Sequence, residues 1–262
     1  MKTLNLLLVL VIVAFYSCNA TDDSYNGNPF DLVDTSNNTT ANTVGNTNEN
    51  TNENTNENSS DNSRRILSLG DSYTIGQSVC ATCRFPVQLK DSIQNNSSYD
   101  VEVDIIAQTG WTTFDLIDAI DEENIDSNYD LVTLLIGVNN QYQNIPFSVY
   151  QSEFPELVQT AISAANGMKN NVIVVSIPDY AYTVFGQNNG NPEVTTQEID
   201  LYNDYAEAYC NAQEITYVYI TDITRLGLDQ PELVASDGLH PSTLAYSKFV
   251  ERLLPFALEK LE

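Results

Sequence analysis

The chain has 262 residues, and its 36 Asp and Glu against 10 Lys and Arg give a formal net charge of −26 at pH 7. A field of this sign repels nucleic acids and anionic lipid headgroups, which argues against both as partners of the folded part of the chain. The sequence holds a single histidine, so any chemistry that needs an imidazole must use that residue.

The first residues predict an export signal. Residues 1–17 contain an early Lys2 and an apolar run that ends at Tyr16, shorter than the roughly 20 residues of a membrane span. Ser17 then precedes Cys18, an arrangement that resembles the lipobox of bacterial lipoproteins, although Tyr16 is bulkier than its strictest form allows. The resemblance implies a lipid anchor on Cys18 and a location in the bacterial cell envelope, at the outer membrane or cell surface. An ordinary signal peptide is the alternative.

Residues 18–63 predict a disordered tether. They consist mostly of Asn, Thr, Asp and Ser, and the sequence TNEN occurs three times between Thr47 and Asn58. Too little apolar surface is present here to offset the entropy of ordering the chain. A flexible segment of this length has a root-mean-square reach of about 35 to 40 Å. The remaining residues, 64–262, have the length of one domain.

Apolar runs alternate with longer segments of helical period in this domain. The runs expected as strands are ILSL (66–69), VEVDIIAQ (101–108), DLVTLLIG (130–137), NVIVVSIP (171–178) and ITYVYITD (215–222). Helices are expected over 85–94, 112–122, 146–165, 195–213 and 242–261. Pro155 is expected to open a second helix or bend the first, and Pro255 to interrupt the last. This alternation predicts an α/β domain of three layers, a parallel sheet covered by helices on both faces.

Four short segments carry polar residues at places where function gathers. They are GDS (70–72), TGW (109–111), GVNN (137–140) and DGLHP (237–241). In open parallel sheets, ligands bind beyond the carboxyl ends of the strands. We therefore expect the four segments to meet at one edge of the sheet.

Ser72 directly follows the first expected strand, where its hydroxyl can point into a cleft. Asp71 and Ser72 could instead merely cap the next helix, which is a common role of both residue types. His240 stands three residues after Asp237 in a turn that contains glycine. Ionised Asp237 can hold one ring nitrogen while the other takes the proton of Ser72, so the pattern predicts a Ser-His-Asp triad.

Acyl transfer also needs donors for the oxyanion that develops on the carbonyl. The backbone N–H groups of Ser72 and Gly110 and the side-chain amide of Asn139 fall at strand ends. Alone, Gly110 would indicate a turn and Asn139 a loop cap. Together with Ser72 and His240 they predict an oxyanion hole.

These blocks resemble those of the SGNH (GDSL-type) hydrolases, a family of esterases and lipases named for its Ser, Gly, Asn and His residues. The resemblance covers residues 65–260 and implies a flavodoxin-like sheet of five parallel strands in the order 2-1-3-4-5. The roles it implies are Ser72 as nucleophile, Gly110 and Asn139 in the oxyanion hole, and Asp237 with His240 in the triad. Asn140 stands where the family commonly has Asp, and the chain lacks the GxSxG sequence of the usual α/β-hydrolases.

Cys80 and Cys83 follow the serine in a CxxC spacing, which occurs in disulfides, redox sites and halves of zinc sites. A zinc site would need further ligands, and within the domain only Cys210 and the histidine already assigned remain. In an exported protein the spacing predicts a short disulfide beside the site, with a pairing to Cys210 as the alternative. No metal and no cofactor is expected.

Four aromatic residues, Tyr142, Tyr180, Tyr182 and Phe185, fall in loops at the strand ends. They can form the wall of an acyl or sugar pocket, or they can pack the loops onto the domain. The sequence predicts an exported serine esterase for short acyl or acetyl esters, including acylated glycans, which touches the membrane only through its anchor. A lipase similar to lysophospholipases or thioesterases is one alternative, and a non-catalytic surface lipoprotein that binds glycans is another.

Overall fold

The computed structural model describes residues 62–262. The expected signal peptide (1–17), the expected lipidation site Cys18 and nearly all of the expected tether (18–63) lie outside the described residues. Within the described part, no helix has both the length and the apolar character that crossing a membrane requires.

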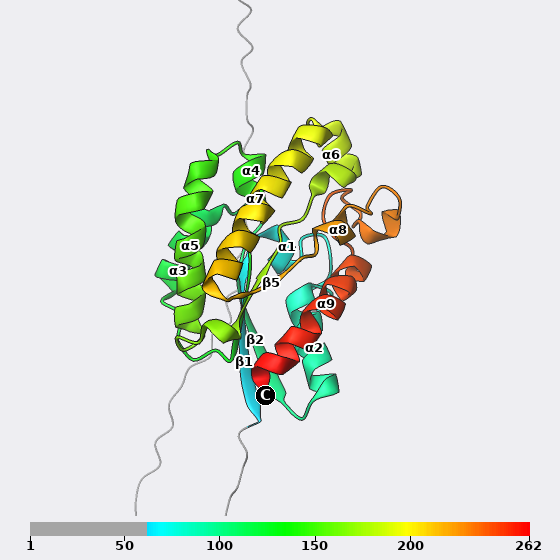
Figure 1. Cartoon of the computed structure of the whole chain (residues 1–262). Coiled ribbons are helices and arrows are strands. Elements are labelled where there is room, and N and C mark those ends of the chain that lie inside the picture. The colour runs from blue at the N-terminus through cyan, green and yellow to red at the C-terminus, as the bar shows by residue number, and fades with distance from the viewer. Residues whose placement is uncertain (1–61) are drawn as a thin grey trace, which may run out of the picture. The chain divides into compact units, whose positions relative to one another are not determined.

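Five parallel strands form one sheet in the order β2-β1-β3-β4-β5. Figure 1 shows this sheet between two groups of helices. They are β1 (Ser63–Gly70), β2 (Asp100–Ala107), β3 (Leu131–Leu135), β4 (Val172–Val175) and β5 (Thr216–Val218). Each overlaps a run expected from the sequence, and the expected strand order is confirmed. Strands β3 and β4 are buried along their whole length, as unbroken apolar runs in a covered parallel sheet require.

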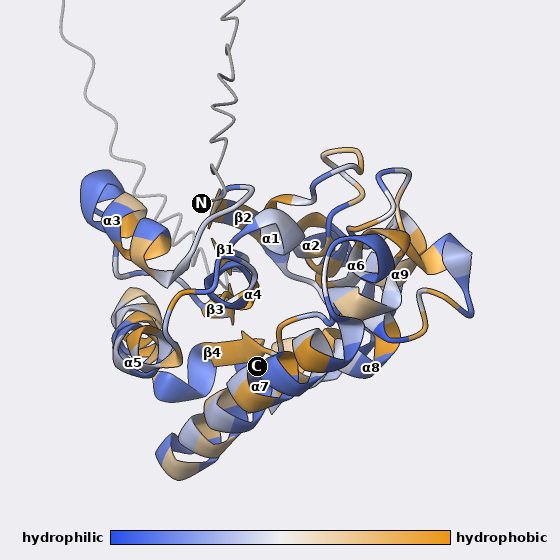
Figure 2. Cartoon of the chain, turned by 90° about the horizontal axis from the view of Figure 1, so that it is seen from above, coloured by the Kyte–Doolittle hydropathy of each residue, from blue (hydrophilic) through white to orange (hydrophobic). Residues whose placement is uncertain are grey.

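Helices cover both faces of the sheet, which confirms the three-layer α/β/α architecture (Figure 2). Helices α2 (Phe85–Asn96) and α9 (Thr243–Leu261) pack together on one face. The other face carries α3 (Thr113–Glu123), α5 (Phe147–Ala164) and α7 (Pro192–Gln213). A short helix, α1 (Ser72–Ile75), begins directly after β1. Shorter elements that the sequence did not predict lie in other connections: α4 (Val138–Tyr142), α6 (Val184–Asn188), α8 (Thr221–Thr224), and the 3₁₀ turns η1 (Lys169–Asn171), η2 (Tyr180–Tyr182) and η3 (Pro231–Leu233).

Two prolines lie inside long helices without interrupting them. Helix α5 runs through Pro155 and α9 runs through Pro255, so the break expected near Pro255 is wrong and no second helix begins at Pro155. A proline deprives the carbonyl four residues earlier of its helical donor. In α5 that carbonyl belongs to Gln151, and it accepts a hydrogen bond from the Tyr205 hydroxyl of α7 at 2.9 Å instead. Pro255 is exposed, so water can reach the corresponding carbonyl in α9.

The register of the sheet aligns the carboxyl ends of three strands. Gly70, the last residue of β1, pairs with Ala107 at the end of β2 and with Leu135 at the end of β3. A Cβ atom at Gly70 would lie 2.4 Å from the carbonyl oxygen of Leu135, so this close approach requires glycine. The loops that carry the expected nucleophile and oxyanion donors therefore all start from one edge of the sheet.

Candidate active site

The expected nucleophile is the first residue of α1, immediately beyond β1. Asp71 caps this helix, because its Oδ1 atom accepts a hydrogen bond from the N–H of Tyr73 at 3.0 Å. The Ser72 residue is 3% exposed, and among residues 62–262 no group forms a hydrogen bond with its hydroxyl. Capping is therefore carried out by Asp71, and the Ser72 hydroxyl is free to take part in chemistry.

Asp237 and His240 form a connected pair in the loop before α9. Nδ1 of His240 lies 2.7 Å from Oδ2 of Asp237, and the N–H groups of Leu239 and His240 donate to Oδ1 at 2.9 and 3.0 Å. Burial favours a higher pKa for Asp237, but hydrogen bonds from Ser78, His240 and the loop backbone outweigh it and lower the pKa to about 2. The carboxylate is thus ionised at neutral pH and orients the imidazole.

A pocket of about 190 Å³ opens at the carboxyl edge of the sheet. It is lined by Ser72, Tyr73, Thr109, Gly110, Val138, Asn139, Tyr142, Tyr180, Phe185, Leu239 and His240. Ser72 and His240 therefore face the same cavity, although within the described residues no hydrogen bond joins their side chains. Such bonds are often long in the free enzyme and shorten when the substrate binds.

The two remaining oxyanion candidates lie on neighbouring loops. Gly110 has a φ of 88°, and no atom lies within 4 Å of the place that a Cβ would take. The Asn139 amide donates to the Trp111 carbonyl at 2.9 Å and lies 3.4 Å from Oδ2 of Asp71. Asn139 thus connects the loops that follow β1, β2 and β3. To reach an oxyanion, one of its N–H groups must turn away from these partners.

An aromatic wall closes one side of the pocket. The Tyr142 ring lies edge-on to Tyr180 with centroids 5.8 Å apart, and it packs beside Phe185 at 6.0 Å. The Tyr180 hydroxyl donates to Oε1 of Gln141 at 2.8 Å, which fixes that ring. These three aromatics have both roles that the sequence left open, because they line the pocket and pack on one another. Tyr182 does not line it.

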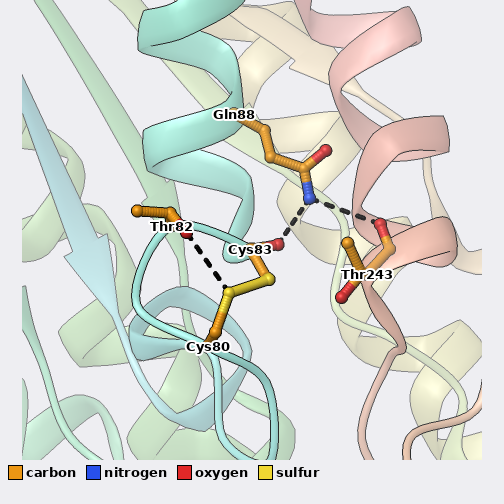
Figure 3. The surroundings of a disulfide bond; sticks show 5 residues. All are labelled: Cys80, Thr82, Cys83, Gln88 and Thr243. Carbon is orange, nitrogen blue, oxygen red and sulfur yellow. Dashed lines mark hydrogen bonds between the residues drawn. A yellow bond between two sulfur atoms is a disulfide. The ribbon is translucent and has the colours of Figure 1, made fainter.

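A disulfide between Cys80 and Cys83 lies in the loop that follows the serine (Figure 3). Cys210 is buried in α7 and unpaired, so the alternative pairing with Cys210 does not occur in the described structure. Burial raises the pKa of the Cys210 thiol to about 12. Within residues 62–262, no cluster of three or more His, Cys, Asp or Glu side chains could hold a metal ion.

The sequence matches the model of one family, described as the GDSL-like lipase/acylhydrolase family, over residues 68–248. The chain belongs to this family. It is accordingly a hydrolase of ester bonds, as the sequence predicted. The comparison with curated proteins gives no match.

Solved structures of GDSL-like hydrolases share the fold. A lipase/acylhydrolase from Enterococcus faecalis has a TM-score of 0.59 at 22% identity, over 76% of this chain and 97% of its own. A psychrotrophic esterase from Pseudoalteromonas sp. has a TM-score of 0.55 at 16% identity, over 76% and 98%. An acetyl xylan esterase from Geobacillus stearothermophilus has a TM-score of 0.54 at 17% identity, over 74% and 94%. These likenesses confirm the expected flavodoxin-like fold.

Asn140, where the GDSL-like family commonly has Asp, is fully buried in α4. Its Oδ1 atom accepts the N–H of Thr113 at 2.9 Å, and its amide donates to the Thr113 hydroxyl at 2.6 Å. That hydroxyl donates in turn to the carboxylate of Glu153 in α5. An Asp at this position would itself accept from the hydroxyl, so Glu153 supplies the acceptor that Asn140 lacks. The start of α3 is thereby held beside α4 in spite of the departure.

Asp71 is fully buried, and among the described residues it has no ion-pair partner. Burial raises its pKa to about 7, against the effect of the hydrogen bond from the Tyr73 N–H. Between about pH 4 and pH 7, the Asp71 carboxyl is therefore protonated in the folded protein and ionised in the unfolded chain. The free energy of unfolding contributed by Asp71 falls as the pH rises through this window.

Replacing Asp71 by Asn is expected to stabilise the fold more at pH 8 than at pH 4.5. The rise in pKa from 3.8 to about 7 corresponds to about 4 kcal/mol at pH 8. At pH 4.5 the same shift corresponds to about 1 kcal/mol, so the expected difference between the two pH values is about 3 kcal/mol. Loss of the contact with the Asn139 amide lowers the stability of the variant at both pH values and leaves this difference unchanged. Urea unfolding of both proteins at each pH measures this difference. An equal effect at the two pH values would contradict the raised pKa.

Sequence reasoning missed two neighbours of the expected triad. The Ser78 hydroxyl donates to Oδ2 of Asp237 at 2.6 Å, across 159 positions of the sequence. The Tyr73 ring packs beside the His240 ring with centroids 5.2 Å apart. No motif or periodicity connects positions so far apart, and the fold alone brings them together.

Proposed function

We propose that this ester hydrolase is an exported, lipid-anchored serine esterase that cleaves short acyl or acetyl esters, including those of carbohydrates. The observation that carries the proposal is the single pocket onto which Ser72, Gly110, Asn139 and His240 open. The Asp237–His240 hydrogen bond of 2.7 Å supports a general base aimed at that pocket. Export and the anchor at Cys18 rest on the sequence of residues 1–18.

In the proposed reaction, His240 takes the proton of the Ser72 hydroxyl while Oγ attacks the ester carbonyl. The N–H groups of Ser72 and Gly110 and the Asn139 amide donate to the resulting oxyanion. The imidazolium returns its proton to the departing alcohol, which leaves an acyl group on Ser72. Water, deprotonated by His240, then attacks this ester and releases the acid. Asp237 stays ionised and stabilises the imidazolium in both steps.

The size and lining of the pocket favour a short acyl group. Its volume of about 190 Å³ lies below the roughly 300 to 1,000 Å³ of sites for drug-sized ligands. Phe185 and Leu239 line it beside the serine, and the aromatic wall limits its extent. A lipase similar to lysophospholipases or thioesterases would need a longer apolar groove.

A carbohydrate alcohol is supported by one residue at the mouth. Tyr142 is 47% exposed while it lines the pocket, so part of its ring surface is open to a ligand. One structural neighbour is an acetyl xylan esterase, and its substrate is carried to this chain as part of the proposal. A glycan-binding protein without activity would not require the Ser72, Asp237 and His240 constellation.

Hydrolysis of p-nitrophenyl acyl esters of increasing chain length tests the proposal. The protein is expressed without residues 1–18, and its Ser72→Ala variant serves as the blank. Turnover above the blank that peaks on acetate or butyrate is expected. A peak at long chains would favour the lipase alternative, and turnover no greater than that of the blank on every ester would argue against catalysis by Ser72.

A further inference from the structure

We infer that Ser78 is a positioning residue that holds the Asp237–His240 pair against the serine loop, and that the Cys80–Cys83 disulfide fixes the turn beside it. The inference rests on the proposed function, because it concerns how the base of that reaction is oriented. Neither the resemblance to the family nor the four sequence blocks assign a role to Ser78 or to the disulfide.

The hydrogen bonds to the Asp237 carboxylate come from two parts of the chain. Its Oδ1 atom accepts the N–H groups of Leu239 and His240, which belong to the same loop. Its Oδ2 atom is shared by Nδ1 of His240 at 2.7 Å and the Ser78 hydroxyl at 2.6 Å. Among the residues described, Ser78 is the donor to Asp237 that comes from outside that loop. It fixes the same oxygen that orients the imidazole.

Backbone hydrogen bonds connect Ser78 to the expected nucleophile. The N–H groups of Gly76 and Gln77 donate to the carbonyl of Ser72 at 3.1 and 3.0 Å, and the N–H of Val79 donates to the Gly76 carbonyl at 3.2 Å. Ser78 itself adopts a φ of 66°, which is uncommon for a residue other than glycine. The position of its hydroxyl is therefore set by the segment that begins at Ser72.

The disulfide turn adds a second connection to the histidine loop. The N–H of Cys83 donates to the Cys80 carbonyl at 2.8 Å, within the turn that the disulfide closes. The Gln88 amide donates to the Cys83 carbonyl and also to the carbonyl of Thr243 at 3.3 Å (Figure 3). Thr243 begins α9, three residues after His240. Ser78 thus contacts the loop of His240 at Asp237, before the histidine, and Gln88 of α2 contacts it at Thr243, after the histidine.

The partial exposure of the Asp237 carboxylate explains why the hydrogen bond from Ser78 matters. Asp237 retains about 30% of its side-chain exposure, so water can compete for its oxygen atoms. A hydroxyl held in place donates to the carboxylate without the entropy of ordering a water molecule. Without the Ser78 hydroxyl, Oδ2 of Asp237 keeps His240 Nδ1 as its protein donor, and the carboxylate is freer to rotate. The carboxylate then fixes less strictly which ring nitrogen of His240 carries the proton and how the ring is oriented.

The test compares Ser78→Ala and Ser78→Gly with the wild-type protein in ester hydrolysis. Both variants lack the hydroxyl, and Gly also relieves the positive φ, so a shared effect reports the hydroxyl rather than backbone strain. We expect kcat to fall about fivefold to tenfold in both, with KM unchanged. Ser163→Ala is the matched control, because the exposed Ser163 hydroxyl donates only to the Gln159 carbonyl within α5. It should leave kcat unchanged.

A spectroscopic measurement separates this inference from the proposed function. Because the chain has one histidine, its two ring ¹⁵N signals are assigned without ambiguity, and their separation reports the tautomer. We expect one tautomer, with the proton on Nδ1, in the wild-type protein, and a mixture in Ser78→Ala and in the Cys80→Ser/Cys83→Ser double variant. Unchanged ¹⁵N signals together with unchanged kcat in Ser78→Ala would overturn the positioning role. Absent turnover in the wild-type protein would instead overturn the proposed function, and the ¹⁵N comparison would still decide the role of Ser78.

Discussion

Replacing His240 by glutamine is expected to lower kcat about 10⁶-fold, because it removes the base that activates Ser72. His240 is 8% exposed and its ring packs beside Tyr73, so a side chain of similar length can fill much of its place. The glutamine amide can still donate to Asp237. It cannot take the proton of the serine hydroxyl.

A double variant tests whether the two residues act as one unit. Steady-state hydrolysis of p-nitrophenyl acetate by His240→Gln, Ser72→Ala and the combination measures the three losses. If the residues share one step, the double variant should be about as slow as either single variant. Losses that multiply, or a His240→Gln protein that keeps most of its kcat, would contradict a histidine base.

Replacing Asn139 by alanine is expected to lower kcat about 10²- to 10³-fold, which corresponds to about 2.7 to 4 kcal/mol of transition-state stabilisation. The amide lines the pocket beside Ser72, where an oxyanion would form. KM should change little, because an oxyanion donor acts mainly on the transition state. The same steady-state assay gives both constants.

The contacts of Asn139 make a second variant necessary. Its amide also donates to the Trp111 carbonyl at 2.9 Å, so truncation could disturb the loop as well as the reaction. Asn139→Leu keeps much of the side-chain volume and removes the donor without placing a carboxylate beside Asp71. Both variants should lose kcat to a similar extent. If both instead lowered the unfolding temperature and left kcat unchanged, Asn139 would have a structural role only.

The sheet could be predicted because its strands have strong and simple signals. The run DLVTLLIG is mostly apolar, and its residues Leu131–Leu135 form β3, which is buried along its whole length. The runs at 66–69 and 171–178 likewise overlap β1 and β4. The strand order came from the resemblance to the family, since periodicity alone does not decide which strands are neighbours.

The helices show where local rules fail. Pro155 was expected to open a second helix or bend the first, since it removes a hydrogen bond. The carbonyl that loses its donor finds another in Tyr205, which is 50 positions away from Pro155 in α7. A tertiary contact therefore overrides a local signal. The short helices α4 and α6 were missed because segments of five residues have too few positions for a period to be recognised.

The grouping of the candidate site residues could be predicted where a residue type and its place after a strand were enough. Ser72, Gly110 and Asn139 all lie at one edge of the sheet because the strands are parallel and in register. The contacts among them were not predictable. The approach of Asn139 to Asp71 and the hydrogen bond from Ser78 to Asp237 join loops that are far apart in the sequence.

Labelling with a phosphonofluoridate ester tests the central claim, that Ser72 is the nucleophile, most directly. Attack by Oγ would form a Ser–O–P bond and release fluoride, which leaves a stable adduct that resembles the tetrahedral intermediate. We predict one adduct per protein by intact mass, located by peptide mapping on Ser72, and none on Ser72→Ala at the same exposure. An unlabelled wild-type protein, or an adduct on another residue that persists in Ser72→Ala, would contradict the account.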